Sequence, residues 1–314
     1  MEHWIAVRLS MGAFDMKKFL FNILIFFGIV AAVDMAAGKV FWYLQTKAGG
    51  RTGAEYYACK ESNEDVIIMG SSRASHHYVP SVIADSLGLS CFNAGQDGNG
   101  IIMQYGRWKM ISERYTPKAV IYDITTFYDL DENDNMTYID RLKPFSDDRG
   151  VKRYVSELFP LERLKLMSRM YRYNYKFMEM IADCRMSKVD ENRGYFPLVG
   201  QIKPEAAERS RLNDKPKNIH YDEVKLHYLE QLAKDCNDRG TKLVFVVSPA
   251  FHDKMNTETL YEPVREIAER NNVQCLMYVN KDYSNHEEWF KDSQHLNDEG
   301  AKAFTSDLTR MIEI

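Results

Sequence analysis

The run Asp65-Val66-Ile67-Ile68-Met69-Gly70-Ser71-Ser72-Arg73-Ala74 decides the fold, and the rest of the chain is arranged around it. Its apolar part, bounded by a charge and a glycine, is typical of a buried strand in a parallel sheet. Ligands of such sheets bind beyond the carboxyl ends of the strands, so we expect Ser72 to be a reactive serine exposed to substrate. The competing interpretation is a polar turn that only closes the strand, and this short pattern does not exclude it.

A second motif, Asp292-Ser293-Gln294-His295, lies on a loop ahead of the last predicted helix. An Asp three residues before a His lets the carboxylate fold back onto one imidazole nitrogen and leaves the other nitrogen free as a base. A serine hydroxyl needs such a base because it must lose its proton as it attacks. We therefore expect Ser72, His295 and Asp292 to meet as a catalytic triad. The alternative is that His295 is only a polar residue flanking a helix.

Strands and helices alternate along most of the chain after residue 64. The predicted strands are 66–69, 90–93, 119–124, 242–247 and 274–278, and the predicted helices are 80–87, 100–115, 221–238, 258–271 and 298–312. This alternation implies right-handed crossovers and a parallel sheet covered on both faces. We predict an α/β protein: a three-layer α/β/α sandwich with a parallel, flavodoxin-like sheet over residues 65–314, with a helical insertion at 129–218.

Within the insertion, apolar residues recur at roughly helical spacing from Val151 to Arg185, and lysines and arginines outnumber acidic residues there. The pattern predicts an amphipathic helical hairpin that packs on the core. The functional alternatives are a lid over the site, a surface that faces lipid, and a basic groove for an anionic polymer. The turn-rich stretch from Asp190 to Pro197 is expected to lie within reach of the cleft.

The amino-terminal region is predicted to anchor the protein in a membrane. The apolar run 19–32 reaches the length of about 20 residues that a span needs only by extending towards residue 44. Three basic residues precede it, Arg8, Lys17 and Lys18, so residues 1–45 are expected to form a cytoplasmic stub and a single transmembrane helix, with the catalytic domain exported. A cleaved signal peptide and an ordinary core helix of a cytosolic hydrolase are the two alternatives. The polar residues 46–64 predict a linker.

Composition argues against several classes of function. A net charge of −4 and no basic cluster with interleaved aromatic residues argue against a nucleic-acid partner. The five cysteines show no Cys-x-x-Cys spacing, so neither a zinc knuckle nor a thioredoxin motif is present. The histidines show no metal-ligand spacing, and we expect neither a metal nor another cofactor. His76 and His77, where a helix is expected to begin, are predicted to face solvent or to cap that helix.

The motifs together resemble those of the SGNH/GDSL hydrolase superfamily over residues 60–314. Gly70-Ser71-Ser72 corresponds to the first block, Phe92-Asn93-Ala94-Gly95 with Gly98 to the second, and Asp292-x-x-His295 to the last. The chain is most similar to membrane-anchored envelope members, such as the D-alanyl-lipoteichoic acid esterases and the polysaccharide O-acetyl transfer proteins. The third block differs, because the family has a Gly-x-Asn-Asp turn where this chain has Tyr122 to Asp129.

The expected chemistry is acyl transfer through an acyl-enzyme, which requires hydrogen-bond donors fixed around the oxyanion. The backbone N–H groups of Ser72 and Gly95 are the first candidates, since glycine lets the backbone come close. Asn99 or the hydroxyl of Thr125 is expected to supply a third donor. Asn93 is expected to be a turn residue at the end of a strand.

Two further residues are predicted at the cleft. Arg73 is expected to hold an anionic group of the substrate or to pair with a nearby acid, and Ser248, at a strand end, is expected to touch substrate. The leading hypothesis is a membrane-anchored serine esterase or O-acyltransferase acting on an acylated, in particular O-acetylated, cell-envelope glycan or a small ester. The alternative is a non-catalytic glycan-binding or scaffold protein within an envelope polymer-modification complex, which the missing third block favours.

Overall fold

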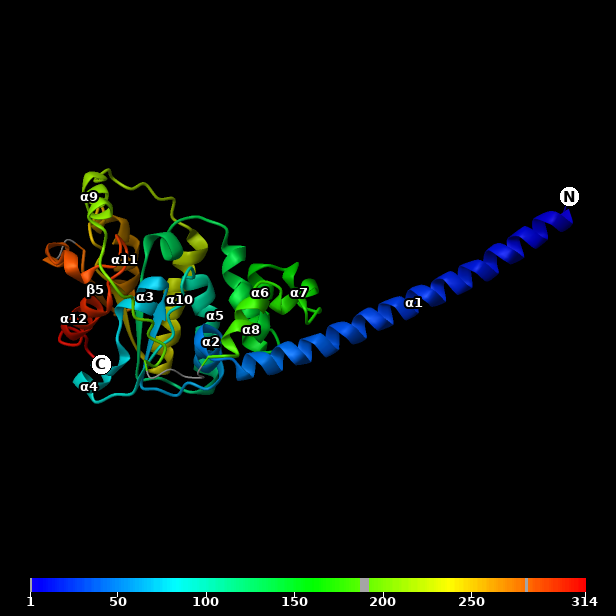
Figure 1. Cartoon of the computed structure of the whole chain (residues 1–314), viewed down its shortest axis with the longest axis horizontal. Helices are drawn as coiled ribbons and strands as arrows, with labels where there is room; N and C mark the ends of the chain where they lie inside the picture. The colour runs from blue at the N-terminus through cyan, green and yellow to red at the C-terminus, as the bar shows by residue number, and fades with distance from the viewer. Residues whose placement is uncertain (1, 187–191, 280–281) are drawn as a thin grey trace.

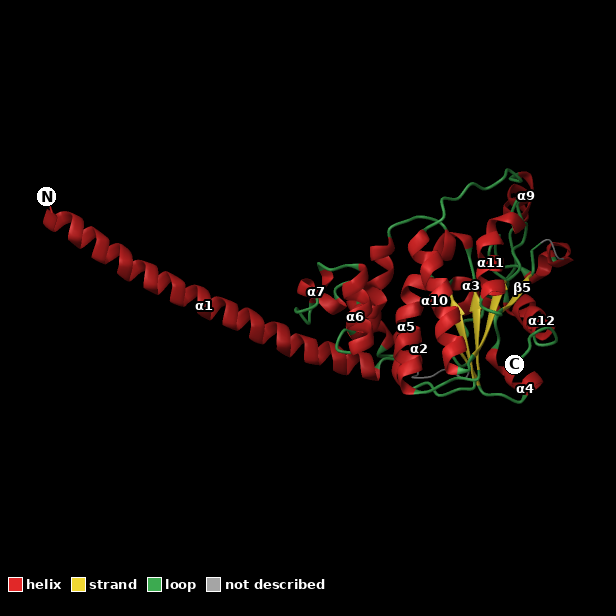
Figure 2. Ribbon diagram, turned by 180° about the vertical axis from the view of Figure 1, so that it is seen from behind, coloured by secondary structure: helices red, strands yellow, loops and turns green. Residues whose placement is uncertain are grey.

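The computed structural model of the protein describes residues 2–186, 192–279 and 282–314, and its centre is a five-stranded parallel sheet (Figure 2). The strands stand in the order β2-β1-β3-β4-β5, which is the flavodoxin-like order. Their bounds are β1 Val66–Gly70, β2 Cys91–Asn93, β3 Ala119–Asp123, β4 Lys242–Val247 and β5 Gln274–Met277. The predicted α/β class and parallel sheet are confirmed.

Each central strand is apolar on both faces because helices cover the sheet on both sides. In β1, Ile67 and Met69 face one core, and Val66 and Ile68 face the other. The first core is covered by α2 Gly50–Lys60, α5 Ile101–Arg114, α10 Glu223–Arg239 and α11 Glu262–Arg270. The second is covered by α3 Ser72–His77, α4 Pro80–Leu87 and α12 Asp298–Leu308. The molecule is thus the expected sandwich of three layers.

Strand register places the polar strand ends at one edge of the sheet. Gly70, the last residue of β1, pairs with Asp123, the last residue of β3, and Asp123 pairs with Val246 of β4. Helix α3 starts two residues after Gly70. The residues that follow β1, β3 and β4 are therefore neighbours, and this edge is where parallel sheets bind ligands.

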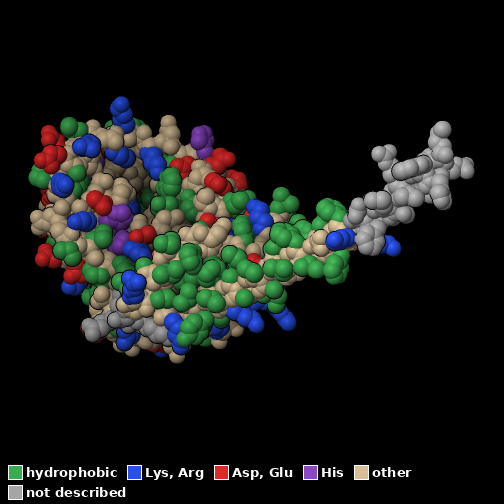
Figure 3. Space-filling model, turned by 45° about the vertical axis from the view of Figure 1, so that its right-hand side comes forward, with side chains coloured by type: hydrophobic (Ala, Val, Ile, Leu, Met, Phe, Trp, Pro, Cys, Tyr) green, Lys and Arg blue, Asp and Glu red, His purple; other side chains and the backbone are tan. Residues whose placement is uncertain are grey.

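Helix α1, Glu2–Lys47, extends away from the sandwich (Figure 1). Its part from Met16 to Lys47 is long and apolar enough to cross a membrane. Large apolar side chains on it, such as Phe19, Leu24 and Phe27, are exposed. Figure 3 shows this apolar surface continuing from the helix onto the adjoining face of the domain.

Residues 46–64 form part of the folded domain rather than the predicted linker. Helix α2 occupies Gly50–Lys60, and its Ala58 and Cys59 are buried in the first core. The carboxylate of Glu55 is buried as well and lies 2.7 Å from the ammonium of Lys176, which is also buried. The composition of 46–64 alone does not reveal this burial, because the cation that compensates Glu55 lies 121 residues away in the sequence.

The insertion at 129–218 consists of short helical segments in its described residues, 129–186 and 192–218. These are the end of η1 Thr126–Leu130, then η2 Asn135–Phe145, α6 Arg149–Leu158, α7 Glu162–Lys165, η3 Tyr171–Tyr173, α8 Phe177–Asp183 and α9 Pro204–Leu212. The predicted hairpin over 151–185 is therefore broken into pieces, and Pro160 explains the first break because proline cannot continue a helix. Asp190 and Glu191, at the start of the loop expected near the cleft, lie outside the described residues. Four short segments complete the chain: η4 Glu258–Tyr261, η5 Asp282–Asn285, η6 Glu287–Trp289 and the turn after α12.

Candidate active site

Ser72 lies at a sharp turn between β1 and α3. Gly70 has φ +135°, and a Cβ built on it would lie 2.5 Å from the carbonyl oxygen of Asp123. Only glycine fits this turn, because a side chain would meet the backbone of the neighbouring strand and would also be strained. The turn makes Ser72 the first residue of α3 and leaves it partly exposed, whereas Ser71 before it is buried.

Ser72, His295 and Asp292 form a continuous series of hydrogen bonds. The hydroxyl oxygen of Ser72 lies 2.8 Å from Nε2 of His295, and Nδ1 of His295 lies 3.1 Å from both carboxylate oxygens of Asp292. Because a carboxylate only accepts, Nδ1 carries the proton and Nε2 is left to accept from the serine hydroxyl. Ser72 and His295 are 223 residues apart in the sequence, and the fold brings them into the arrangement by which a histidine base can activate a serine.

Asp292 is held by the loop that also carries the histidine. Its Oδ1 accepts hydrogen bonds from the backbone N–H groups of Gln294 at 2.8 Å and His295 at 2.9 Å. Partial burial raises the pKa of Asp292, but the hydrogen bonds from His295 and from the Gln294 backbone outweigh it and lower the pKa below its usual value. The carboxylate is therefore ionised, and it stabilises the positive charge that His295 gains when it takes a proton.

His77 is fully buried and joins the two segments of the site, contrary to the expectation that it faces solvent. Its Nε2 accepts from the backbone N–H of Leu296 at 3.0 Å, so its other nitrogen must carry the proton of the neutral ring. That Nδ1–H donates to the hydroxyl of Ser248 at 3.0 Å. Burial lowers the pKa of His77 well below its usual value, and the nearby Arg73 and His295 lower it further. A neutral histidine thus ties the helix of Ser72 to the residue after His295.

His76 is also buried and faces the same site. Its Nδ1 lies 2.6 Å from the carbonyl oxygen of Phe196, and its Nε2 lies 3.3 Å from a carboxylate oxygen of Asp97. Asp97 also pairs with Arg51 of α2 at 2.8 Å. The His76 and His295 rings meet edge to face with 5.6 Å between their centres. Sequence reasoning missed these contacts, and the only signal was that His76 lies one helical turn after Ser72.

Among the predicted oxyanion donors, the N–H of Ser72 is the first of α3 and makes no hydrogen bond with a described residue. The N–H of Gly95 donates instead to the side-chain oxygen of Asn93 at 2.9 Å, so the structure does not leave it free for an oxyanion. The Asn93 amide donates to the carbonyl oxygens of Ala74 and Tyr78. Asn93 thus lies at the end of a strand, as expected, and its side-chain oxygen accepts the hydrogen bond of the Gly95 N–H.

Both candidates for the third donor already donate a hydrogen bond within the protein. The amide of Asn99 donates locally to the carbonyl oxygen of Asp97 at 2.9 Å, which uses one of its two hydrogens. The hydroxyl of Thr125 donates to Asp129 at 3.1 Å and lies 3.4 Å from the hydroxyl of Ser71. The buried carboxylate of Asp129 also accepts from Tyr122 and from two backbone N–H groups. Thr125 is therefore part of a buried hydrogen-bond network centred on Asp129, just after β3.

Arg73 and Ser248 lie at the cleft in different ways. Arg73 donates to the carbonyl oxygen of Ser248 at 3.2 Å and to the side chain of Gln294 at 2.9 Å, and it is only partly buried. It bridges the end of β4 and the loop of Asp292 and His295. The prediction that Ser248 touches substrate is not supported, because its side chain is buried beneath α3 and is bound by His77.

A buried acid lies at the end of β3, where Asp123 pairs with Gly70 of β1. Asp123 ends β3 and accepts a hydrogen bond from the hydroxyl of Tyr78. Burial raises the pKa of Asp123 to about 6, although the charge of Arg73 and the hydroxyls of Ser248 and Tyr78 act in the opposite direction. The acid is therefore protonated in the folded protein at mildly acidic pH and charged above it.

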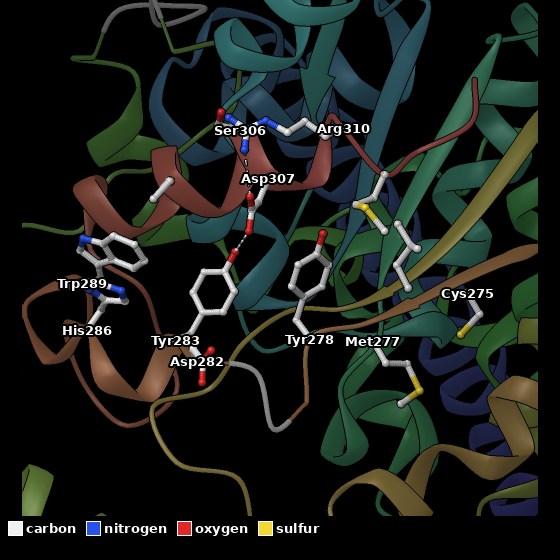
Figure 4. Close-up of a pocket in the computed structure, with 13 residues that line it drawn as sticks. Cys275, Met277, Tyr278, Asp282, Tyr283, His286, Trp289, Ser306, Asp307 and Arg310 are labelled. Atoms are coloured by element: carbon white, nitrogen blue, oxygen red, sulfur yellow. Dashed lines mark hydrogen bonds and ion pairs between the residues drawn. The ribbon is translucent and has the colours of Figure 1, made fainter.

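A cavity lies away from Ser72. It has a volume of about 760 Å³ and lies beside β5 and α12, where Tyr278, Tyr283 and Trp289 form aromatic walls (Figure 4). None of the predicted site residues lines it. No group of three or more His, Cys, Asp or Glu residues within the described ranges is placed to hold a metal ion.

Comparisons with known proteins find structural similarity at low sequence identity. No protein-family model matches the chain, and no curated protein matches it. A crystal structure of a protein from Bacteroides fragilis, provisionally assigned as an acylhydrolase, is similar to this chain with 12% sequence identity and a TM-score of 0.36. That similarity covers 80% of this chain and 89% of the other.

Proposed function

We propose that the chain is a membrane-anchored serine esterase or O-acyltransferase acting on an O-acetylated glycan of the cell envelope. The observation that carries the proposal is the distance of 2.8 Å between the Ser72 hydroxyl and Nε2 of His295, with Asp292 on the other ring nitrogen. Hydrogen bonds of catalytic bases fall in the range of about 2.6–3.2 Å. The resemblance of the three motifs to envelope members of the SGNH/GDSL superfamily supports the choice of an acylated glycan.

The reaction runs in two halves. The Ser72 oxygen attacks the ester carbonyl carbon while His295 takes the hydroxyl proton, and the histidine then delivers that proton to the leaving alcohol as the carbon–oxygen bond breaks. Water or a sugar hydroxyl next gives its proton to His295 and attacks the acyl carbon. His295 returns that proton to the Ser72 oxygen as the bond between this oxygen and the acyl carbon breaks, which frees Ser72. Asp292 stabilises the positive ring in both halves, and the Ser72 N–H is the donor open to the oxyanion.

A membrane position supports an envelope substrate. We infer that α1 crosses the membrane once, with Lys17 and Lys18 on the cytoplasmic side and the sandwich outside. Epitope tags at the two ends of the chain test this orientation in intact cells treated with protease from outside. The carboxyl-terminal tag should be removed and the amino-terminal tag protected, and the reverse result contradicts the inferred orientation.

The proposed chemistry is tested with the full chain in detergent micelles and p-nitrophenyl acetate as substrate. The Ser72→Ala variant should lose its hydrolysis, and a Ser81→Ala variant, which changes an exposed serine on α4, should keep it. Equal hydrolysis by wild type and Ser72→Ala would remove Ser72 from the mechanism. Adding chitooligosaccharide to the same assay distinguishes the two acceptors, because acetylated sugar detected by mass spectrometry indicates transfer and free acetate alone indicates hydrolysis.

One observation favours the second candidate, a non-catalytic glycan-binding protein. The Gly95 N–H is engaged by Asn93 and the Thr125 hydroxyl by Asp129, so two of the predicted oxyanion donors are occupied. A fluorophosphonate probe separates the candidates, because it labels a serine only where the base and the oxyanion donors act together. Labelling of wild type but not of Ser72→Ala supports the enzyme. Unlabelled wild type that still binds glycan supports the binding protein.

A further inference from the structure

A segment of the insertion is fixed to the apolar helix α1 at a defined level. Asp34 of α1 accepts hydrogen bonds from the hydroxyl of Ser168 at 2.6 Å and from the backbone N–H groups of Arg169 at 2.8 Å and Met170 at 3.0 Å. One turn further on, a Cβ at Gly38 would lie 2.3 Å from the Cβ of Arg169, so glycine is what allows this close approach. Figure 1 shows α7 at the end of the domain from which α1 extends.

The length of the apolar run determines where this level lies in a membrane. The run from Phe19 to Val33 has 15 residues and rises about 22 Å, which is less than the hydrocarbon thickness of about 30 Å. A span that begins after Lys18 must therefore continue about one turn past Asp34, to near Gly38. The face of α1 turned away from the domain suits this, because Met35 and Val40 are 52% and 55% exposed.

Asp34 can lie within the span because its carboxylate accepts hydrogen bonds from the protein. A charged group at the edge of a bilayer is costly unless it is hydrogen-bonded. Both of its oxygens accept bonds from the segment 168–170. The segment that supplies these bonds must lie at the same depth as Asp34, about one helical turn inside the edge of the hydrocarbon near Gly38.

The side chains of this segment are arranged as they would be at a lipid surface. Leu161, Leu164 and Met167 are 75%, 67% and 76% exposed. Glu162 lies between them in the sequence but points inward, where it accepts hydrogen bonds from Lys165 and Tyr171. Burying the acid and exposing the leucines is unfavourable in water, and such contiguous apolar exposure marks an interaction surface.

The charges of the segment favour a bilayer as the partner. Arg163 and Lys165 are exposed on the same short helix α7, and its one acid, Glu162, is buried and paired. Long basic side chains extend from an apolar surface to reach phosphates, and anionic lipid attracts them. Figure 3 shows hydrophobic side chains along α1 and on the adjoining face of the domain.

We propose that residues 161–170 form a second membrane contact, with Leu161, Leu164 and Met167 in the upper acyl region of the leaflet that faces the domain. The inference rests on the proposed span of α1 and needs no catalytic activity. The contact fixes the orientation of the sandwich on the membrane, because a single helix allows the domain to rotate and tilt whereas two separate contacts do not. The cleft is then held at a constant height and angle relative to the bilayer.

The test uses the full chain in vesicles of phosphatidylcholine and phosphatidylglycerol. Cys184 and Cys275, the two cysteines that are not buried, are first replaced by alanine. Single cysteines carrying an environment-sensitive nitrobenzoxadiazole dye are then placed at Leu164, at Phe26 in the middle of α1, and at Leu212. Leu212 is a matched control, since it is 79% exposed on α9, at the far end of the domain from α1 (Figure 1).

Quenching by spin-labelled lipids reports the depth of each dye. The Leu164 dye should be quenched by lipids labelled near the headgroup at least about twofold more than the Leu212 dye, and the Phe26 dye should be quenched most by lipids labelled deep in the acyl chain. If the Phe26 dye is quenched and the Leu164 dye is not, the span exists and the second contact is refuted; a partner protein then covers this surface. If neither is quenched, the span itself is refuted. Met167→Cys replaces Leu164→Cys if the latter unfolds.

Discussion

Replacing Asp292 by asparagine should lower the rate of ester hydrolysis by about 10- to 100-fold and leave KM nearly unchanged. The substitution removes the charge but keeps the local structure. Oδ1 of Asp292 accepts both loop N–H groups and also lies 3.1 Å from Nδ1 of His295. An asparagine oxygen at this position can still hold the proton on Nδ1, so the variant isolates the electrostatic effect of the carboxylate.

The magnitude follows from the distance and the exposure. Two unit charges 3.1 Å apart attract by about 1 kcal/mol at the dielectric constant of water and by about 5 kcal/mol at an effective dielectric of about 20. The Asp292 side chain is 51% exposed and the His295 side chain 23%, so solvent screens the pair and the lower half of this range applies. The stated 10- to 100-fold loss of rate corresponds to about 1.4–2.7 kcal/mol of transition-state stabilisation, which falls within this lower half.

The assay is p-nitrophenyl acetate hydrolysis by the full chain in micelles, at low salt and at 1 M sodium chloride. The ratio of wild-type to Asp292→Asn rates should shrink at high salt, because exposed charges are screened there. His295→Ala serves as the reference for complete loss of the base. An unchanged rate in Asp292→Asn would show that the carboxylate does not assist His295, and a loss as large as that of His295→Ala would refute the electrostatic reasoning.

Three other perturbations have defined outcomes. His77→Phe should lower kcat about tenfold and destabilise the fold by about 2–5 kcal/mol, because it leaves the Leu296 N–H and the Ser248 hydroxyl without their partner. His77→Gln can replace both hydrogen bonds and serves as the control. Steady-state kinetics and denaturant unfolding measure the two effects. Lys176→Met should cost about 3–5 kcal/mol by leaving Glu55 buried without its closest cation, and adding Glu55→Gln should recover most of that loss in a double-mutant cycle. The free energy of unfolding of Asp123→Asn, relative to that of wild type, should rise by about 3 kcal/mol as the pH is raised from 4 to 7. The folded pKa of Asp123 is raised to about 6, so the stabilising protonated form is lost as the pH rises through that value.

Each of these predictions has a contrary result. Equal kinetics for the phenylalanine and glutamine variants of His77 would show that its hydrogen bonds do not position the site. A double variant at Lys176 and Glu55 as unstable as the single one would show that the two charges do not compensate each other. A constant stability difference between Asp123→Asn and wild type across this pH range would contradict the conclusion that burial raises the pKa of Asp123.

Much of the candidate site could be predicted because its parts are local patterns. A turn that needs glycine, a serine after it, and an Asp three residues before a His are each encoded within a few residues, and strand order brings them together. The oxyanion donors could not be predicted in the same way. Whether the Gly95 N–H is free depends on the rotamer of Asn93, and whether the Thr125 hydroxyl is free depends on the position of Asp129.

The sequence by itself determined the parallel sheet, the apolar helix and the two motifs, because periodicity and turn chemistry are properties of neighbouring residues. Only the tertiary structure decided which polar residues are buried. Glu55 is buried in the core because Lys176 reaches it, and His77 is buried because Leu296 and Ser248 bind its two nitrogens. A polar group can be buried only where partners satisfy it, and these partners come from segments far apart in the chain.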